Sequence, residues 1–417
     1  MKSNFNKPFT QQEAIDEATI ERVSALLRGG RLHRYNTLEG EISEAAQLEK
    51  EYATYQEARY CLACSSGGYA LAVALRAAGL KPGDTVLANA YTLAPVPGAI
   101  HNAGGIPLFV EIDDAWHIDV VDLQQKAEVS GARFLMLSHM RGHIADMDRI
   151  VAICKAHQIT IVEDCAHTMG ARWNGIRSGN FGHVAAFSAQ TYKHINSGEG
   201  GLLTTDDPVI AARAIIMSGS YMLYGSHGAA PDEAVFAQVK LETPNYSGRM
   251  DNMRAAILRG QLQSLDDNVR RWNERYRVLE TRLSNSTAID VTERRQNEEF
   301  VGSSIQFRPR LAVSGFEPLI ANCLARGVDI KWFGAEQPKA FTSRYDSWRY
   351  LGEQEPLPQT LEVLSRTCDI RVPLTFEPAD CKQVADIIAQ EVEELQSAFA
   401  MTGRDESELS LEPDSQN

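Results

Sequence analysis

The chain has 417 residues, of which 44% are hydrophobic and 23% are charged, the composition of an ordinary globular protein. Its length suits one large α/β subunit with a smaller lobe, or two to three average domains. The formal net charge is -14 without a basic run, so we expect no nucleic-acid partner. No apolar stretch reaches the roughly 20 residues of a membrane helix, and the first residues lack the apolar core of a signal peptide. We therefore expect a cytoplasmic protein without a membrane partner.

Two kinds of pattern alternate through the first two-thirds of the chain. In chain order they predict helices over residues 13–27 and 40–55, a strand over 59–63, a helix over 69–78, a strand over 85–88, a helix over 95–103, a strand over 107–112, a helix over 120–129, a strand over 134–138, a helix over 146–157, and strands over 160–163, 183–188 and 201–205. The strands are near-continuous apolar runs, which is typical of a mainly parallel sheet buried on both faces. The alternation predicts a three-layer α/β/α domain. The last two strands have no helix between them, which indicates an antiparallel pair.

The last third of the chain has a weaker α+β pattern. It predicts one long helix over residues 254–284, a strand over 304–307, a helix over 318–326, a strand over 329–332 and a helix over 380–399. The long helix could bridge to a second lobe. We therefore predict a large domain over residues 12–265, a smaller C-terminal domain over 266–400 and a disordered acidic tail over 401–417.

The seven cysteines are an odd number spread along the chain, which argues against a disulfide framework. Cys61 and Cys64 form a C-x-x-C pattern, but no second pair at zinc-ligand spacing accompanies it. The residues around the pair are apolar. We therefore predict a buried strand there, and no metal site.

Three features point to a cofactor. Lys193 stands between an apolar run that ends in serine and the glycine cluster at residues 198–201. Asp164 ends a buried strand, and the turn at residues 65–68 is rich in glycine and leads into a helix. Pyridoxal phosphate needs a lysine to attach to, an acid for its ring nitrogen, and a phosphate cradle at a helix N-terminus.

Each feature also has an ordinary interpretation. A lone lysine is usually on the surface, a strand-end aspartate often caps the next helix, and glycine-rich turns are common. Their conjunction in this order is more specific than any one of them. A Rossmann dehydrogenase is disfavoured because the turn lacks the G-x-G-x-x-G spacing.

The residues around Lys193 also carry a family resemblance. The matching positions are Ser66 to Leu71, Gly83 to Val86, Gly142, Ala145 to Asp148, Glu163 to His167, Gly182, Phe187-Ser188, Lys193, Gly198 to Gly201, Asn245-Tyr246, Ala255-Ala256 and Gln261-Leu262. In these the chain resembles the DegT/StrS-type sugar aminotransferases, which are fold-type I enzymes dependent on pyridoxal phosphate. The resemblance covers about residues 12–270, and continues more weakly to the C-terminal helix.

The resemblance implies a role for each matching position. Lys193 would carry the Schiff base to the cofactor, and Asp164 would pair with the pyridine nitrogen. The cofactor phosphate would be bound by Ser188 and by the backbone of Gly67, Gly68 and Tyr69. Asn245, with Arg249 as an open second candidate, would reach the neighbouring subunit's cofactor, because the family's sites lie at a homodimer interface.

Three positions depart from the family pattern. Gly68 stands where the family usually has threonine, and Leu93 where it usually has an aromatic residue that stacks on the cofactor ring. Tyr69 or Tyr91 could supply a ring instead, or Leu93 itself could pack on the cofactor. His167 replaces a glutamine and could bind the cofactor's phenolic oxygen, and we expect it to titrate near neutral pH. These changes indicate an altered substrate or chemistry.

The leading prediction is a ping-pong aminotransferase that moves an amino group from glutamate or glutamine to a keto-sugar or keto-cyclitol. One alternative is an enzyme of the same family that transaminates or eliminates an amino acid or another small metabolite. Another is a non-catalytic regulatory homologue that binds pyridoxal phosphate. Relatives that dehydrate sugars have histidine at the lysine position, so Lys193 disfavours that branch, although His194 leaves the register open. The segments at residues 31–35, 221–227 and 331–333 are candidates for substrate specificity.

Overall fold

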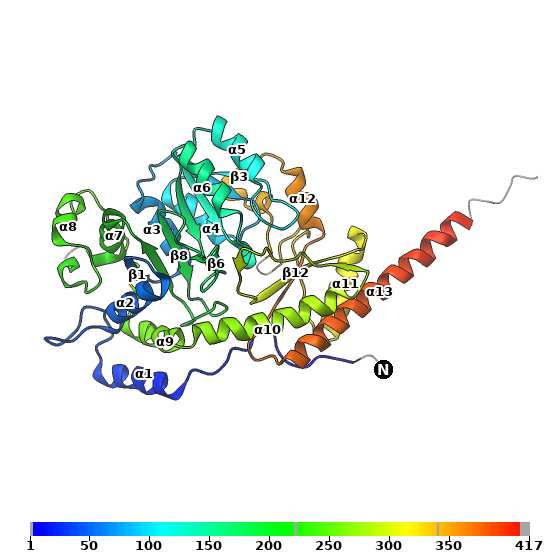
Figure 1. Ribbon diagram of the computed structural model, residues 1–417, viewed down its shortest axis with the longest axis horizontal. Helices are drawn as coiled ribbons and strands as arrows, with labels where there is room; N and C mark the ends of the chain where they lie inside the picture. Colours follow the sequence, from blue (N-terminus) through cyan, green and yellow to red (C-terminus); the bar gives the residue numbers. More distant parts are fainter. Residues whose placement is uncertain (1–2, 221–222, 340–341, 409–417) are drawn as a thin grey trace, which may run out of the picture.

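The computed structural model describes residues 3–220, 223–339 and 342–408. A seven-stranded sheet forms the centre of the larger part (Figure 1). Its strands are β1 (Tyr60–Cys64), β2 (Thr85–Asn89), β3 (Ile106–Val110), β4 (Phe134–Ser138), β5 (Thr160–Asp164), β8 (Val184–Ser188) and β9 (Gly201–Thr205). The strand order is β1-β9-β8-β5-β4-β2-β3, and β9 is antiparallel to both of its neighbours while the other pairs are parallel. The predicted antiparallel pair is confirmed.

Both faces of this sheet are buried. On β4, Leu135 and Leu137 belong to one apolar cluster, whereas Phe134 and Met136 belong to another on the opposite face. Each cluster is completed by helices, so the predicted three-layer α/β/α arrangement is confirmed. Helices α3 (Gly67–Ala77), α4 (Pro95–Ala103) and α7 (Pro208–Ile215) cover one face, and α2 (Glu44–Gln56), α5 (Val120–Val129), α6 (Met147–Ala156) and α9 (Asn252–Leu262) cover the other.

The predicted single helix over residues 254–284 is wrong, because the structure divides it into α9 and α10 (Leu265–Ser284). The break falls at residues 263–264. Leu258 and Leu262 pack with α2 and β1, whereas Trp272 and Tyr276 pack in the cluster that includes the second sheet. The two halves therefore bury their apolar faces against different partners.

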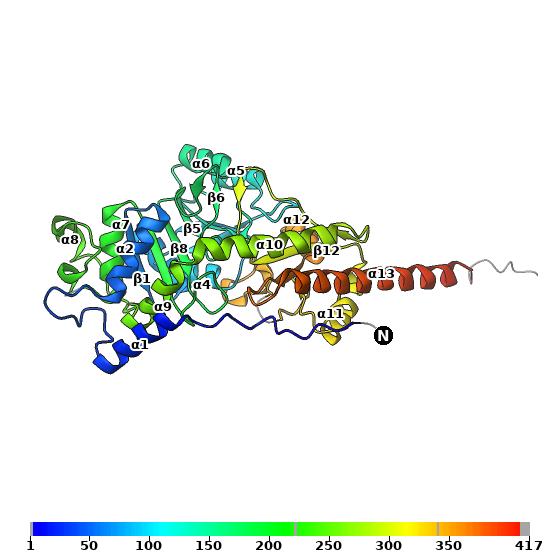
Figure 2. The same ribbon diagram turned by 60° about the horizontal axis from the view of Figure 1, so that its bottom comes forward.

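A second, antiparallel sheet has the order β10-β12-β14-β13. Its strands are β10 (Ile289–Asp290), β12 (Ser304–Pro309), β13 (Lys331–Trp332) and β14 (Cys368–Arg371). Helix α11 (Phe316–Ala325) contributes apolar residues to its core, and so does α13 (Pro378–Glu408), which projects from the body of the molecule (Figure 2). Helix α13 extends past the predicted end at Phe399 into the predicted tail, whose residues 409–417 lie outside the described part. The domain boundaries remain a prediction.

The N-terminal segment lies against the C-terminal part of the chain, next to the start of α13. Phe5 and Phe9 pack edge-on against Phe376, with ring centroids 5.0 and 4.9 Å away. Helix α1 (Glu17–Gly29) follows, at the other end of this extended segment (Figure 2).

The prediction missed several short elements, each too brief for a periodic pattern. They are α8 (Glu233–Val239), α12 (Pro358–Ser365), β6 (Arg172–Trp173), β7 (Ile176–Arg177), β10, β11 (Glu298–Glu299) and β14. Among the described residues, no helix is both long enough and apolar enough to cross a bilayer.

Candidate active site

A cavity of about 510 Å³ opens at the carboxyl ends of β4 and β5, next to β14 of the second sheet. Seven of the nine predicted site residues line it: Gly67, Gly68, Leu93, Asp164, His167, Ser188 and Lys193. Tyr69 and Asn245 do not. The carboxyl ends of parallel strands are where open α/β sheets bind ligands, so the position of the cavity follows from the fold.

The predicted phosphate cradle is the junction between β1 and α3. Ser66 caps α3, and its Oγ accepts the backbone N–H of Tyr69 at 3.1 Å. A Cβ on Gly67 would lie 2.8 Å from the Cβ of Ser188, so glycine is needed for the helix end to approach that serine. The first N–H groups of a helix lack partners within the helix, and here they lie beside the Ser188 hydroxyl. This geometry fits a phosphate group.

The glycine cluster after Lys193 supports this cradle from the neighbouring strand. Gly201 begins β9 and pairs with Cys64 at the end of β1. A Cβ on Gly201 would lie 2.4 Å from the carbonyl carbon of Ser66, so only glycine allows the loop and the strand to meet. The role of this glycine is therefore to bring the two segments together.

Asp164 ends β5 and is 7% exposed. Its Oδ2 accepts the Ser138 hydroxyl at 2.8 Å, and its Oδ1 accepts the backbone N–H of Ala166 at 3.1 Å. Ser138 pairs with Asp164 in the register of β4 and β5, which explains why these side chains meet. The two hydrogen bonds fix the carboxylate at the wall of the cavity.

Lys193 faces His167, with 2.8 Å between Nζ and Nε2. Burial lowers the pKa of Lys193 to about 7. The charge of Asp164 opposes this shift, and the nearby Arg141 and Arg371 add to it. The lowered pKa makes the neutral amine, which is the nucleophilic form, far more accessible at pH 7 than in an exposed lysine.

His167 is neutral at pH 7, so our expectation that it titrates near neutral pH is wrong. Burial, followed by the charge of Lys193, lowers its pKa well below the usual value. Its Nδ1 accepts the backbone N–H of Arg141 at 3.3 Å. The proton of the neutral ring is then on Nε2, which donates to the lone pair of the Lys193 amine.

The neighbouring histidine points elsewhere. The Nε2 of His194 lies 3.0 Å from the Ser303 hydroxyl, and its ring packs edge-on against Trp272 at 5.1 Å. His194 does not line the cavity, so Lys193 is the one of these two residues that faces it.

The aromatic alternatives to Leu93 also lie outside the cavity. The Tyr69 hydroxyl donates to the carbonyl of Met217 at 2.9 Å, and Tyr91 is buried edge-on against Phe333. Their rings are therefore held by the protein itself, and Leu93 alone of the three lines the cavity.

Asn245 and Arg249 lie away from this cavity as well. Asn245 is exposed and accepts the backbone N–H of Ser247 at 2.9 Å, while Arg249 donates to the carbonyl of Gly219. The predicted role of Asn245 concerns the site of a neighbouring subunit, and it stays a prediction.

Sequence reasoning assigned no site role to several polar residues that line the cavity, among them Arg141, Tyr192 and Arg371. Arg141 has a left-handed backbone, with φ of 55°, and forms an ion pair with Asp369 at 3.0 Å. No pattern in the sequence announces this contact, because Asp369 is on the second sheet. Conversely, none of the described residues in the segments 31–35, 223–227 and 331–333 lines the cavity, and residues 221–222 lie outside the described part.

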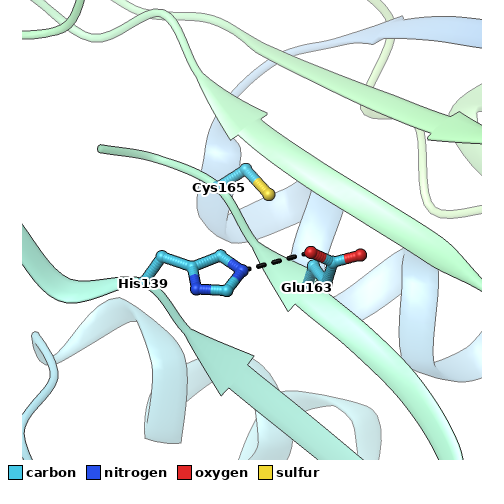
Figure 3. A group of neighbouring side chains, drawn as sticks. All are labelled: His139, Glu163 and Cys165. Carbon is cyan, nitrogen blue, oxygen red and sulfur yellow. Dashed lines mark hydrogen bonds and ion pairs between the residues drawn. The ribbon is translucent and has the colours of Figure 1, made fainter. Parts of the chain in front are cut away.

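A buried group of His139, Glu163 and Cys165 lies at the carboxyl ends of β4 and β5 (Figure 3). The Glu163 carboxylate accepts the backbone N–H groups of Gly179, Phe181 and Gly182 at 2.6 to 3.0 Å, and lies 3.1 Å from His139 Nε2. Burial raises the pKa of the Cys165 thiol well above its usual value. The carboxylate is thus occupied by the loop after β7 and the sulfur is protonated, so this group fastens the loop and is poorly suited to a metal.

The predicted buried strand at Cys61 and Cys64 is confirmed. Both residues lie in β1 and are at most 2% exposed. All seven cysteines are buried.

A model of the DegT/DnrJ/EryC1/StrS aminotransferase family matches residues 13–389. The chain belongs to this family. The resemblance seen in the motifs around Lys193 is therefore confirmed over most of the chain.

The chain is similar to a pleiotropic regulatory protein of Geobacillus stearothermophilus, which is 34% identical over 55% of this chain and 58% of that protein. The GDP-perosamine synthase of Escherichia coli O157:H7 is 32% identical over 55% of this chain and 60% of that protein. The matched part thus spans less than two thirds of either relative.

Similar solved structures confirm the predicted fold class. The structure of 3-amino-5-hydroxybenzoic acid synthase has a TM-score of 0.80 at 22% identity, covering 94% of this chain and all of that chain. DesV of S. venezuelae, in complex with a ketimine intermediate, has a TM-score of 0.76 at 26% identity and covers 90% of this chain and 94% of that chain.

Proposed function

We propose that this protein is an aminotransferase dependent on pyridoxal phosphate. It would take the amino group of glutamate or glutamine and pass it to a keto-sugar or keto-cyclitol by a ping-pong mechanism, as a cytoplasmic homodimer with shared sites. Family membership supports this proposal, as do relatives named for such reactions, among them a L-glutamine:2-deoxy-scyllo-inosose aminotransferase of Streptomyces kanamyceticus. The observation that carries it is the desolvated Lys193, which lines the same cavity as Asp164.

The residues present fit the cofactor. The helix end at Gly67 and Gly68 with the Ser188 hydroxyl suits the phosphate, and Asp164 suits the ring nitrogen because its carboxylate is fixed at the cavity wall. Lys193 would hold the cofactor covalently. When bound, pyridoxal phosphate supplies an electron sink for the carbon that bears the amino group.

The chain's own groups handle the proton. Because burial lowers the pKa of Lys193 to about 7, its amine can both accept and release a proton at neutral pH. The Nε2–H of His167 holds the amine by a hydrogen bond at 2.8 Å and orients its lone pair. Leu71, Leu93 and Val96 form an apolar wall of the cavity, which excludes water from this exchange.

A half-reaction tests the proposal. The purified protein is loaded with pyridoxal phosphate and given glutamate without an acceptor. We expect one equivalent of 2-oxoglutarate per site, together with loss of the cofactor's absorbance near its original maximum. No release of keto acid with glutamate, glutamine or any other amino donor would contradict the aminotransferase proposal.

A regulatory role is the second candidate, because one relative is named a pleiotropic regulatory protein. Such a homologue would bind the cofactor, and borohydride would fix it on Lys193, without keto acid being released. The half-reaction therefore separates the two functions.

A further inference from the structure

Arg371 is a cation in the cavity wall. It ends β14, and Asp369 lies two residues before it on the same face of the strand. The Asp369 carboxylate is already used, by the Gln306 amide at 2.6 Å and by Arg141 at 3.0 Å. Among the described residues, no carboxylate forms an ion pair with Arg371.

The position of the Arg371 guanidinium is nevertheless fixed. It lies 3.7 Å from the centroid of the Tyr192 ring, and Tyr192 directly precedes Lys193. Stacking on a ring holds the guanidinium plane and leaves its edge N–H groups available for a planar anion. Burial, followed by the charge of Arg141, lowers the pKa of Arg371, and Asp369 and Tyr192 offset this only in part, so an anion placed there would stabilise the charged guanidinium.

Away from Arg371 and Lys193, the cavity wall is mostly apolar. Apolar side chains form much of the remaining wall: Leu71, Leu93, Pro95, Val96, Met140 and Trp348. The charged side chains among the described lining residues are Asp164 and the three cations Arg141, Lys193 and Arg371. Positive charge is therefore concentrated beside the reactive amine.

We propose that Arg371, held by Tyr192, binds a carboxylate of the substrate that faces Lys193, with Arg141 as a neighbouring positive charge. The inference rests on the proposed function and names a recognition residue for it. The carboxylate comes from the amino-acid donor, from a carboxylate-bearing acceptor, or from both, because the two substrates of a ping-pong reaction use the same site in turn.

The test is binding without turnover. Calorimetry on the protein loaded with pyridoxal phosphate uses two probes: glutarate, which copies the donor chain, and cyclohexanecarboxylate, which copies a ring acceptor with one carboxylate. We expect Arg371→Gln to raise the Kd of glutarate by about 10- to 100-fold, the loss of a charge-assisted paired hydrogen bond. Arg371→Lys keeps the charge but lacks the planar guanidinium, so its Kd for glutarate should fall between those of the wild type and Arg371→Gln.

The matched control is Arg59→Gln. Arg59 also lies over a tyrosine ring, at 5.1 Å from that of Tyr60, but it is exposed and outside the cavity. It should change neither Kd. Cofactor absorbance and melting temperature show whether each variant is folded and loaded.

Weaker binding of glutarate alone assigns Arg371 to the donor, and weaker binding of both probes assigns it to both substrates. Unchanged binding of both probes in a folded, loaded Arg371→Gln protein overturns the inference. Absence of binding by the wild type overturns it as well. Because no keto acid is measured, failure of the aminotransferase proposal gives a separate result.

Discussion

Two of the buried groups of charged side chains in the described part of the chain differ in how completely their charges are paired. In the first, Arg34 donates to both carboxylate oxygens of Glu49 at 2.8 and 2.7 Å, and both side chains are at most 1% exposed. Glu49 also accepts the N–H of Ala63 at 2.8 Å and lies 3.2 Å from His227. Burial opposes ionisation, yet Arg34 and His227 bring the pKa of Glu49 down to about 2.

The second group, around Lys193, is incomplete. Asp164 is the only acid that lines the cavity among the described residues, against Arg141, Lys193 and Arg371. The first group joins α2, β1 and two loops, and its charges are paired with one another within the protein. The second keeps a cation without an ion-pair partner among the described residues and an amine whose pKa is about 7, which suits a substrate site. The comparison teaches that the degree of pairing, and not burial, separates a structural cluster from a functional one.

The largest expected effect comes from removing the amine of the incomplete group. Lys193→Ala should reduce keto-acid release from glutamate by on the order of 10⁴-fold or more, because no other described amine lines the cavity. The melting temperature should stay equal or rise, since a desolvated amine is lost. A marked fall in melting temperature with activity retained would mean that the group around Lys193 has a structural role and not a functional one.

Breaking the complete group should act on stability instead. Glu49→Ala leaves the Arg34 charge buried without a partner and should lower the free energy of unfolding by about 3–5 kcal/mol. Urea denaturation measures this. The control is Glu21→Ala, whose ion pair with Arg28 is 72–73% exposed and should contribute less than about 1 kcal/mol. Equal losses in the two variants would contradict the comparison.

The pH dependence of stability should report the lowered pKa of Lys193. In the cofactor-free protein its pKa is about 7, whereas an unfolded lysine has about 10.4. Between these values the unfolded chain binds the extra proton, so the protein should become more stable as pH rises from 7 to 10, by at most about 1.4 kcal/mol per pH unit. Lys193→Met should lack this increment, and identical slopes in both proteins would show that the amine is not desolvated.

The smallest effect is expected at His167. His167→Gln keeps a side-chain donor for the Lys193 amine, so keto-acid release should fall by only about 10-fold, while His167→Ala should cost more. Single-turnover rates measure both. A Gln variant as weak as the Ala variant would mean that the ring itself, and not its N–H, is required.

The sequence predicted what depends on local pattern. The strands at residues 134–138 and 201–205 and the helices at 95–103 and 120–129 match to the residue, because apolar runs and caps define them. Lys193, Asp164 and Ser188 meet because parallel strand ends meet. The break between α9 and α10, the turned-away ring of Tyr69 and the approach of Arg371 depend on contacts between distant segments, which no local pattern encodes.

The seven buried thiols have a practical consequence. Burial raises the pKa of Cys61, Cys64, Cys165 and Cys368, so in the native chain these sulfurs are neither ionised nor accessible. They lie in β1, after β5 and in β14, on both sides of the Lys193 cavity. The rate at which a maleimide labels each thiol therefore measures how often the region around that thiol opens, without an engineered reporter.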